Sequence, residues 1–427
     1  MRVVYLAAGA AGMLCGSCLR DNRLVATLRA RGRDALLVPL YTPIRTDEQD
    51  VSEHTVFYGG INVYLEQKSA FFRHLPRFLT RALDARWLLE GVGKYASKTR
   101  AADVAELTVS ILRGEDGNQE AELDRLVEGL RELRPRVINL PNLMFLGIAR
   151  RLRHELKAAI VCTLSGEDLF IDALPEDARG QVLEILKTCR DDASAYIATS
   201  RYYRDHCVRH FGLPAAKVHH VPMGIDTASP SPRTAEPDGP FTIGYLARIG
   251  PEKGLMNLAR AFVKLRDEGR NCRLKFAGYL GEADRPYLEF VQDYLLGQGC
   301  ANAYEYLGEV TREQKFEMLA NLHAFSVPTD YAEAKGLFVL EALAAGVPAV
   351  QPDHGSFPEL IETTGGGLLY EKGSTDELAA QLARLMDDAD LRRSLGEAGR
   401  RAVAEKFSQD VMADGTWRIY EWCSESI

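Results

Sequence analysis

The stretch that decides the fold is "PTDYAEAKGLFVLEALAAGVPAVQPDHGSFPEL", residues 328–360. A strand is expected to end at Pro328, and an apolar helical run follows Gly336. Gly346, with Pro348 two residues later, is a typical end for that helix, and "PAVQP" reads as the next strand. Strand, loop, helix and strand in this order form the unit of a parallel sheet.

The same alternation fills most of the chain. Apolar runs predict strands, and segments of helical period lie between them. The expected strands of the first half begin at "MRVVYLAAG" and continue with "ALLVPLY", "AAIVCTL" and "SAYIATS". Those of the second half are "FTIGYLA", "CRLKFAG", "AYEYLG", "AFSVPT" and "PAVQP". This predicts an α/β protein with two doubly wound, Rossmann-like domains.

A segment rich in Pro, Ser and Thr separates the two halves. "TASPSPRTAEPDG", residues 227–239, has no apolar period and is typical of a linker. We therefore expect an N-terminal domain over 1–226, a linker over 227–240 and a C-terminal domain over 241–406. Because ligands of open α/β sheets bind beyond the carboxyl ends of the strands, we expect both domains to face a common cleft.

Composition excludes several classes of protein. The 427 residues carry a formal net charge of −8, with 46% hydrophobic and 26% charged residues. This argues against a surface built for nucleic acid. The sequence has no apolar window of membrane-spanning length and opens directly on a strand, so we expect a cytoplasmic protein. Its eight cysteines are expected to be reduced thiols.

Two carboxylates in the first stretch are eight residues apart. Glu333 lies in the loop and Glu341 on the following helix. Backbone N–H groups near Gly336, Leu337 and Phe338 open that helix and suit a phosphate. We expect Glu341 to reach a ribose diol and Glu333 to face a sugar.

A second stretch, "GYLARIGPEKGL" at 244–255, supplies cations. Arg248 follows a strand and Lys253 precedes the next helix. Together they are placed to neutralise a diphosphate leaving group without a metal ion. We interpret the adjacent Glu252 as a surface residue. Asp388 and Asp390 have the Asp-x-Asp spacing of metal-dependent transferases, but they stand between helical stretches and are interpreted as turn and cap residues.

These motifs resemble those of the retaining GT-B glycosyltransferases of family 4. The resemblance covers nearly the whole chain, and the segments that carry it are "EAKGLFVLE", "ARIGPEKGL", "VHHVPMGID", "YLGEVTREQ" and "FSQDVMADGTWRIYEW". It implies a nucleotide-sugar donor on the C-terminal domain, an acceptor on the N-terminal domain and transfer with retention. It also implies that the last helix, about 407–427, returns to the N-terminal domain, and that Glu333, Arg248 and Lys253 are catalytic.

Three positions of the donor side depart from the family pattern or complete it. Lys335 stands where the family often has Phe and adds a third cation beside the phosphates or meets an acidic sugar. Gly355, preceded by His354, stands in the family's Gly-Gly position and keeps a close backbone approach. The resemblance thus adds Lys335, Gly336, Leu337, His354 and Gly355 to the donor site.

The acceptor side departs further. Two positions that often carry His in the family are Asn139 in "INLPN" and Ser165 in "TLSGED". Glu167 and Asp168 are the nearest titratable replacements, although both also fit as surface carboxylates that cap the next segment.

The first loop, "GAAGMLCGSC", admits two interpretations. Aligned on the following helix, it corresponds to the family's glycine-rich loop, which places Gly16 and Ser17 near the donor phosphates or the acceptor. Cys15 and Cys18 also form a CxxC, so a redox centre is an alternative. No second Cys or His pair with metal spacing accompanies it, which argues against zinc.

Residues 68–100 are locally basic, with eight Lys or Arg against two acids. Aromatic and leucine side chains interleave with the arginines, which fits peripheral contact with anionic lipid or with an anionic acceptor. A helix with its apolar face in the domain core fits the same pattern.

The sequence therefore predicts a retaining, metal-independent glycosyltransferase without a cofactor. Its donor is a UDP-, GDP- or ADP-sugar, and its acceptor is a lipid or an anionic glycan. The alternatives are a non-catalytic nucleotide-sugar-binding protein, a GT-B epimerase or, through the CxxC, a redox protein.

Overall fold

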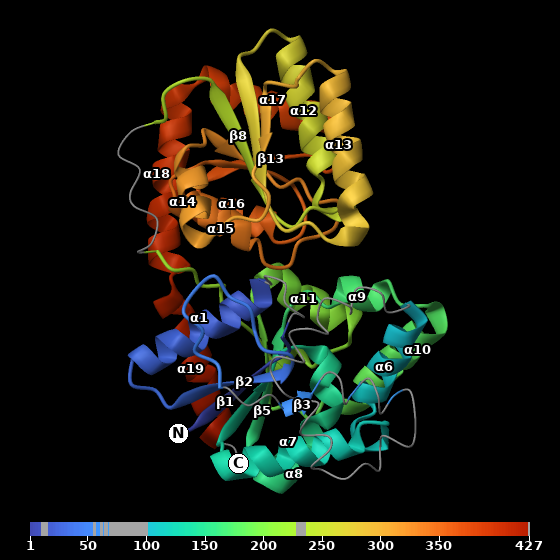
Figure 1. The fold of residues 1–427 in the computed structure, drawn as a ribbon. Helices are drawn as coiled ribbons and strands as arrows, with labels where there is room; N and C mark the ends of the chain where they lie inside the picture. Colours follow the sequence, from blue (N-terminus) through green and yellow to red (C-terminus); the bar gives the residue numbers. More distant parts are fainter. Residues whose placement is uncertain are drawn as a thin grey trace. The chain divides into compact units, whose positions relative to one another are not determined.

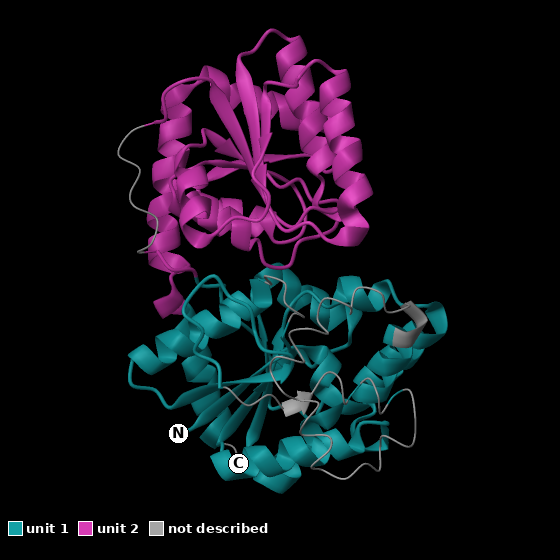
Figure 2. Ribbon diagram, in the orientation of Figure 1, with its two compact units in different colours: residues 1–224, 412–427 teal, residues 225–411 magenta. Residues whose placement is uncertain are grey.

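Parallel strands alternate with helices throughout the described chain (Figure 1). A computed structural model describes residues 1–9, 16–53, 57–59, 63, 67, 101–227 and 236–425. The chain divides into unit 1, residues 1–224 and 412–427, and unit 2, residues 225–411 (Figure 2). The predicted domain boundary at 226 lies beside this division.

Unit 1 contains a seven-stranded sheet in the order β3-β2-β1-β4-β5-β6-β7. All of its strand pairs are parallel. The strands are β1 (Val3–Ala7), β2 (Ala35–Tyr41), β3 (Phe57–Gly59), β4 (Val137–Leu140), β5 (Ala159–Leu164), β6 (Ala195–Ala198) and β7 (Val218–His220). The order runs outward in both directions from β1 and β4, which makes the sheet doubly wound, as predicted.

The strands of unit 1 are short apolar runs because helices cover both faces of the sheet. Every residue of β1, β4, β5 and β6 is buried, as expected for parallel strands covered on both sides. The helices are α1 (Gly16–Ala30), α6 (Ala101–Leu112), η2 (Gly114–Asp116), α7 (Glu120–Leu133), η3 (Leu143–Ile148), α8 (Ala149–Leu156), α9 (Asp168–Asp172), α10 (Glu176–Cys189), α11 (Arg201–His210), η4 (Ala215–Lys217) and α19 (Gln409–Glu425).

The C-terminal helix α19 packs in unit 1, as the family resemblance implied. Its Trp417 and Tyr420 join the core cluster that α1 and one face of the sheet form. The Tyr420 hydroxyl also donates a hydrogen bond of 3.0 Å to Asn139 Oδ1 on β4. The two ends of the chain are therefore held on one sheet.

Unit 2 contains a six-stranded parallel sheet in the order β10-β9-β8-β11-β12-β13. The strands are β8 (Phe241–Leu246), β9 (Cys272–Ala277), β10 (Tyr304–Tyr306), β11 (Ala324–Phe325), β12 (Ala349–Pro352) and β13 (Gly367–Tyr370). The helices are η5 (Pro251–Lys253), α12 (Leu255–Asp267), η6 (Glu282–Asp284), α13 (Arg285–Gly297), α14 (Arg312–Ala320), α15 (Leu337–Ala344), α16 (Phe357–Thr364), α17 (Thr375–Asp387) and α18 (Ala389–Lys406).

One predicted strand of unit 2 is shorter than expected. The run "AFSVPT" was expected to continue to Pro328, but β11 ends at Phe325. Ser326 N still donates to Gly244 O of β8, and Thr329 N then donates to Val327 O, which turns the chain. The loop with the candidate residues therefore begins earlier than the sequence suggests.

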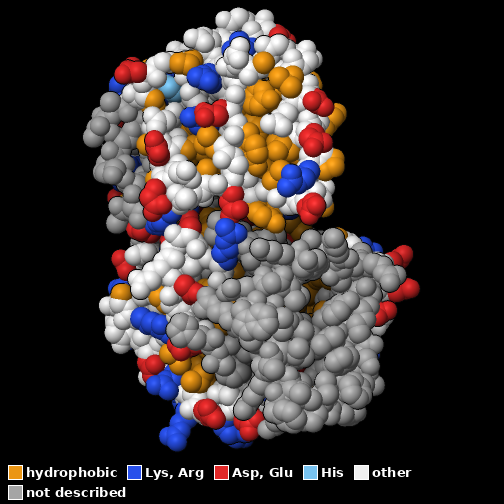
Figure 3. All heavy atoms as spheres, viewed as in Figure 1, with side chains coloured by type: hydrophobic (Ala, Val, Ile, Leu, Met, Phe, Trp, Pro, Cys, Tyr) orange, Lys and Arg blue, Asp and Glu red, His pale blue; other side chains and the backbone are white. Residues whose placement is uncertain are grey.

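Exposed apolar side chains are few in the described part of the molecule. Apolar side chains gather on the side of unit 2 covered by α12 and α13 in Figure 3, and Phe290 and Leu296 of α13 are among the most exposed. No helix in the described ranges has both the length and the apolar character needed to cross a membrane.

Candidate functional site

The centre of the candidate site is an ion pair in unit 2 between Lys253 and Glu333. Lys253 ends η5, which follows β8, and Glu333 lies in the loop between β11 and α15. Lys253 Nζ is 3.0 Å from Glu333 Oε2. Both follow neighbouring strands of the parallel sheet, so they meet at its carboxyl edge, where ligands of such sheets bind.

Glycines allow the two loops to come together. Gly254 has φ +74°, and a Cβ there would lie 1.8 Å from Pro328 O. Gly355 has φ +63°, and a Cβ there would lie 2.6 Å from Glu333 N. Both positions combine a left-handed backbone with a close approach that only glycine tolerates. The close approach at Gly355 is thus to the backbone of Glu333, and its predicted approach to the donor stays a prediction.

Glu333 is buried and accepts hydrogen bonds on both carboxylate oxygens. Oε2 accepts from Lys253 Nζ and, at 2.6 Å, from the Tyr331 hydroxyl. Oε1 accepts from the backbone N–H of Lys335 at 3.1 Å and of Gly336 at 3.5 Å. Burial acts to raise the pKa of Glu333, but the charge of Lys253, the Tyr331 hydroxyl and the charge of Lys335 outweigh it and lower this pKa to about 2.

Lys253 is enclosed by oxygens and aromatic rings. Its ammonium contacts the Tyr331 hydroxyl as well as Glu333. It also lies 4.8 Å from the centre of the Tyr331 ring and 5.3 Å from that of Phe338, within the range of cation–π attraction. The Lys253 side chain is only 17% exposed.

Helix α15 begins beside this pair without a side-chain cap. Its N-cap is Gly336, with φ +69°, and no side chain caps the helix. The N–H groups of a first helical turn have no partner within the helix, and the helix dipole adds positive potential there. The backbone N–H groups of Leu337 and Phe338 therefore form an anion-binding surface next to Lys253.

Glu341 does not stand free on α15, because it pairs with a lysine that the sequence analysis did not single out. Lys315 Nζ of α14 lies 2.8 Å from Glu341 Oε1, and both side chains are 8% exposed. A ribose that reaches Glu341 would thus meet an ion pair. Lys315 lies in the helix after the family-like "YLGEVTREQ", but its position carries no local signal.

Arg248 lies apart from the Lys253–Glu333 pair. Its guanidinium pairs with Glu252 and, at 3.0 Å, with Asp284 Oδ2. Glu252 lies at the surface, as interpreted, with a side chain that is 38% exposed, and its carboxylate pairs with Arg248. The arginine side chain is 44% exposed, so an arriving phosphate would compete with two carboxylates for it.

His354 stands at the edge of the Glu333 loop. Its Nε2 lies 3.0 Å from Thr329 O, so this nitrogen carries the proton, and Nδ1 is buried without a hydrogen-bond partner among the described residues. Burial and the charge of Lys372 lower the pKa of His354. His354 is therefore held neutral and joins two loops of the site.

On unit 1, Asn139 lies inside the protein. It has no exposed surface, and its side chain bonds to Thr163 Oγ1 at 3.0 Å and to the Tyr420 hydroxyl. Thr163 Oγ1 in turn lies 3.2 Å from the Tyr5 hydroxyl, which donates to Asp21 Oδ1 at 2.8 Å. This arrangement gives Asn139 a place in a buried polar network and does not favour contact with an acceptor.

Glu167 caps a turn of unit 1. Its oxygens accept from the N–H groups of Leu143 at 3.0 Å and Ser165 at 2.6 Å, and Oε2 lies 3.2 Å from the Tyr203 hydroxyl. The Ser165 hydroxyl donates to Pro141 O. Burial raises the pKa of Glu167, and these neutral donors do not fully offset it.

Asp168 opens α9 and bonds to α11. It accepts from the Tyr203 hydroxyl at 2.9 Å and lies 3.3 Å from His206 Nε2. Burial acts to raise the pKa of Asp168, but the hydrogen bonds from His206 and Tyr203 outweigh it and lower this pKa. The two adjacent carboxylates therefore differ: the pKa of Asp168, which lies near a histidine, is lowered, and the pKa of Glu167, which has neutral donors around it, is raised.

Of the remaining residues that the sequence singled out, some are described by the structure and others are not. Gly16 and Ser17 form the first turn of α1, and Cys18 is a buried free thiol. Asp388 caps α18 by accepting from Leu391 N at 2.8 Å, which confirms its interpretation as a cap. Cys15 and the basic segment 68–100 lie outside the described residues.

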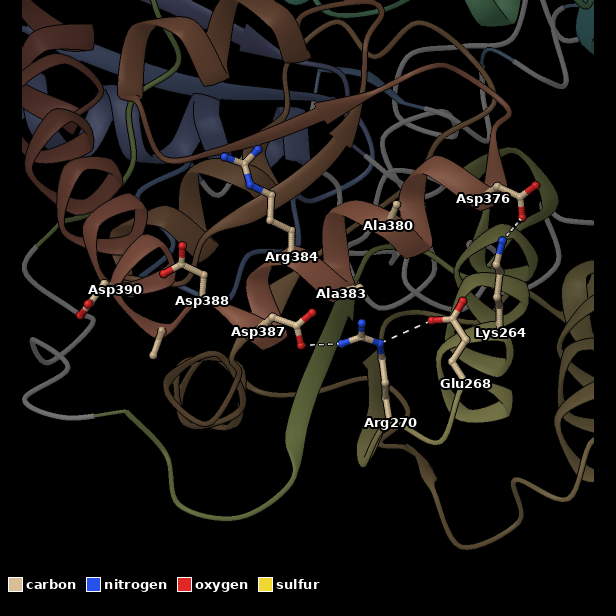
Figure 4. Close-up of a pocket in the computed structure, with 11 residues that line it drawn as sticks. Lys264, Glu268, Arg270, Asp376, Ala380, Ala383, Arg384, Asp387, Asp388 and Asp390 are labelled. Atoms are coloured by element: carbon tan, nitrogen blue, oxygen red, sulfur yellow. Dashed lines mark hydrogen bonds and ion pairs between the residues drawn. The ribbon is translucent and has the colours of Figure 1, made fainter.

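A depression elsewhere on unit 2 contains none of the predicted site residues. It has a volume of about 820 Å³ and lies between α12 and α17 (Figure 4). Lys264 pairs there with Asp376 at 2.5 Å, and Arg270 with Asp387 at 2.6 Å. Two of its cations are thus held by acids of the same depression, and it is not the candidate site.

Metal ligands are not gathered in the described ranges: no group of three or more His, Cys, Asp or Glu side chains there is arranged to hold a metal ion.

Two family models match this chain. "Glycosyl transferases group 1" matches residues 228–402, and "Glycosyltransferase Family 4" matches residues 109–229. The two matches together extend over more than half of the sequence.

Curated relatives are glycosyltransferases by name. A GDP-mannose-dependent alpha-(1-6)-phosphatidylinositol monomannoside mannosyltransferase of Mycobacterium tuberculosis is 29% identical over 281 residues, which is 62% of this chain and 70% of that protein. An MMP alpha-(1->4)-mannosyltransferase of Mycolicibacterium hassiacum is 30% identical over 212 residues, 49% of this chain and 50% of the other.

Solved structures share the fold of the whole chain. A sucrose-phosphate synthase from Thermosynechococcus elongatus has a TM-score of 0.71 at 16% identity, with both chains fully covered. Anabaena HepE, in complex with UDP, has a TM-score of 0.68 at 15% identity, covering 99% of this chain and 100% of that one. These likenesses establish the two Rossmann-like domains of the GT-B fold.

Proposed function

We propose that this chain, which belongs to the GT-B glycosyltransferases of family 4, transfers a sugar with retention from a nucleotide diphosphate donor, without a metal ion. The observation that carries the proposal is the Lys253–Glu333 pair beside the uncapped start of α15. A partly buried ammonium and the N–H groups of a helix terminus lie side by side there, which suits a diphosphate.

The cations act on the leaving diphosphate. The Lys253 ammonium is held by Glu333 and aromatic rings next to the start of α15. Charge that develops on the diphosphate as the glycosidic bond breaks is stabilised by such fixed donors. Arg248 joins this role once a phosphate replaces Glu252 or Asp284 as its partner.

Glu333 acts as the anchor of the donor site and not as a nucleophile. Both of its oxygens already accept hydrogen bonds, and its lowered pKa keeps it charged at neutral pH. A carboxylate held in this way is a poor attacking group. We therefore propose that the acceptor attacks from the face of the leaving phosphate and that this phosphate takes the acceptor proton, which yields retention.

The acceptor is proposed to be a glycolipid. One relative is named as a phosphatidylinositol monomannoside mannosyltransferase, and this supports a lipid-linked acceptor for this chain. The donor base is left open between uridine, guanosine and adenosine, and GDP is favoured by the same relative.

The test is the stereochemistry of sugar release. The protein is incubated with UDP-, GDP- and ADP-sugars of α configuration, with and without EDTA, and the first product is followed by proton NMR. Release of the α-anomer that EDTA leaves unchanged supports the proposal. A β-anomer as first product contradicts retention, and loss of activity that added metal restores contradicts metal independence.

A further inference from the structure

Tyr331 joins the two residues at the centre of the donor site. Its hydroxyl donates a hydrogen bond of 2.6 Å to Glu333 Oε2 and contacts Lys253 Nζ. Its backbone oxygen accepts from Thr329 Oγ1 at 2.9 Å, which holds the residue in the loop. No motif or family pattern drew attention to it.

The direction of each hydrogen bond follows from chemistry. An ionised carboxylate only accepts and an ammonium only donates, while a phenol hydroxyl does both. Tyr331 therefore accepts from Lys253 and donates to Glu333. Two of the three ammonium N–H groups are thereby directed at Tyr331 and Glu333, and the rings of Tyr331 and Phe338 flank the ammonium.

We propose that Tyr331 is a positioning residue that aims the third N–H of Lys253 at the leaving phosphate and keeps Glu333 ionised. The proposal rests on the proposed function, in which Lys253 acts on the diphosphate. Tyr331 does not contact the reacting atoms and acts only through these two partners.

The phenol is suited to this role because it stays protonated. Burial and the neighbouring charge of Glu333 raise the pKa of Tyr331 far above its ordinary value. The hydroxyl therefore keeps the proton that it donates to Glu333 across the whole pH range in which the protein is folded.

The first test compares Tyr331→Phe with Tyr306→Phe by donor cleavage. Tyr306 is the matched control, since its hydroxyl makes a hydrogen bond in unit 2 to a neutral partner, Gly278 O, at 3.2 Å. We expect Tyr331→Phe to lower kcat by about 10-fold or more, the usual effect of losing a hydrogen bond to a charged group, with donor KM within about twofold of the wild type. We also expect the acid limb of its pH profile to move upward, because the pKa of Glu333 rises toward its ordinary value. The same kcat loss at every pH, or no loss, would overturn the proposal.

The second test needs no turnover. Thermal unfolding is measured for Tyr331→Phe, for Glu333→Gln and for the variant that carries both substitutions. A control cycle replaces Tyr331→Phe with Tyr306→Phe and keeps Glu333→Gln. If Tyr331 and Glu333 are coupled, the Tm of the double variant should be only slightly lower than that of the less stable single variant. Additive losses like those of the control pair would overturn the proposal. If the wild type cleaves no nucleotide sugar, the proposed function fails, and this cycle still decides whether Tyr331 organises Glu333.

Discussion

Glu333 of unit 2 and Glu167 of unit 1 are both buried carboxylates in loops that follow parallel strands, yet their pKa values move in opposite directions. Glu333 contacts the ammonium of Lys253, and its pKa falls to about 2. Glu167 receives its hydrogen bonds from two backbone N–H groups and lies beside the neutral Tyr203 hydroxyl, and its pKa rises. Burial is common to both, so the difference comes from the cation.

This contrast distinguishes the proposed anion site around Glu333 from the structural turn around Glu167. The unit 2 edge brings together Lys253, Lys315 and the uncapped start of α15. The candidate residues of unit 1, in contrast, satisfy one another, with Asn139 inside a buried network and Glu167 on a turn. A position at the carboxyl edge of a sheet therefore permits a binding site, and in the proposed function fixed positive charge decides where the diphosphate binds.

The largest expected effect comes from removing the cation of unit 2. Lys253→Met is expected to lower donor cleavage by about 10²–10³-fold, the range for a lost electrostatic donor to a developing anion. Steady-state kinetics with the donor that the wild type cleaves measures it. The control is Lys264→Met, which removes an exposed lysine paired with Asp376. Equal activity of the two variants would show that Lys253 has no part in the chemistry.

The two carboxylates are expected to give stability profiles of opposite slope. The lowered pKa of Glu333 stabilises the fold above pH 4.5, and this stabilisation of about 3 kcal/mol is lost as pH falls toward 2. The raised pKa of Glu167 gives stability that is present below pH 4.5 and lost as pH rises through the folded pKa.

Urea unfolding of the wild type, Glu333→Gln and Glu167→Gln from pH 3 to 8 measures both slopes. The stability difference from the wild type should shrink toward acid for Glu333→Gln and toward neutral pH for Glu167→Gln. Parallel profiles would mean that the contrast between the units is absent in solution.

Asn139 tests the unit 1 half of this comparison, in which the candidate residues are structural. Asn139→Ala is expected to destabilise the protein by about 1–3 kcal/mol, because Thr163 and Tyr420 lose a buried partner. The activity of the folded variant should equal that of the wild type. Asn321→Ala, on the surface of unit 2, serves as the control for denaturation. A loss of activity that depends on the acceptor concentration would restore Asn139 to the acceptor site.

The smallest effect concerns Arg248. Glu252→Gln is expected to increase donor affinity by at most about fivefold, since an exposed ion pair contributes up to about 1 kcal/mol and its loss frees Arg248 for phosphate. Isothermal titration calorimetry measures the change. Weaker donor binding in this variant would mean that Glu252 is needed to place the arginine.

The sequence predicted the fold well because it depends on apolar periods and on Gly or Pro boundaries, which are local. The helix over 337–344 and the helix cap at Asp388 are examples. Side-chain partners that come from distant segments were harder to predict from the sequence. Asp284 lies 36 residues from Arg248, and Lys315 lies 26 residues from Glu341, so neither pair leaves a spacing that can be recognised.

Tyr331 shows a second limit of the sequence. It lies two residues from Glu333, but an aromatic residue in a loop belongs to no periodic pattern, and only the folded loop brings its hydroxyl to Lys253. Asn139 shows the reverse case, because its place in the family pattern suggested a ligand contact whereas the fold buries it.

The measurement that tests the central claim most directly is thermal stabilisation by UDP-, GDP- and ADP-sugars of the wild type and of Lys253→Met. At about 100 times its dissociation constant, the correct donor should stabilise the wild type by about 2.7 kcal/mol, and Lys253→Met should show a much smaller shift at the same concentration. Equal stabilisation of both proteins, or none by any nucleotide sugar, would contradict the assignment of the Lys253–Glu333 site to the donor diphosphate.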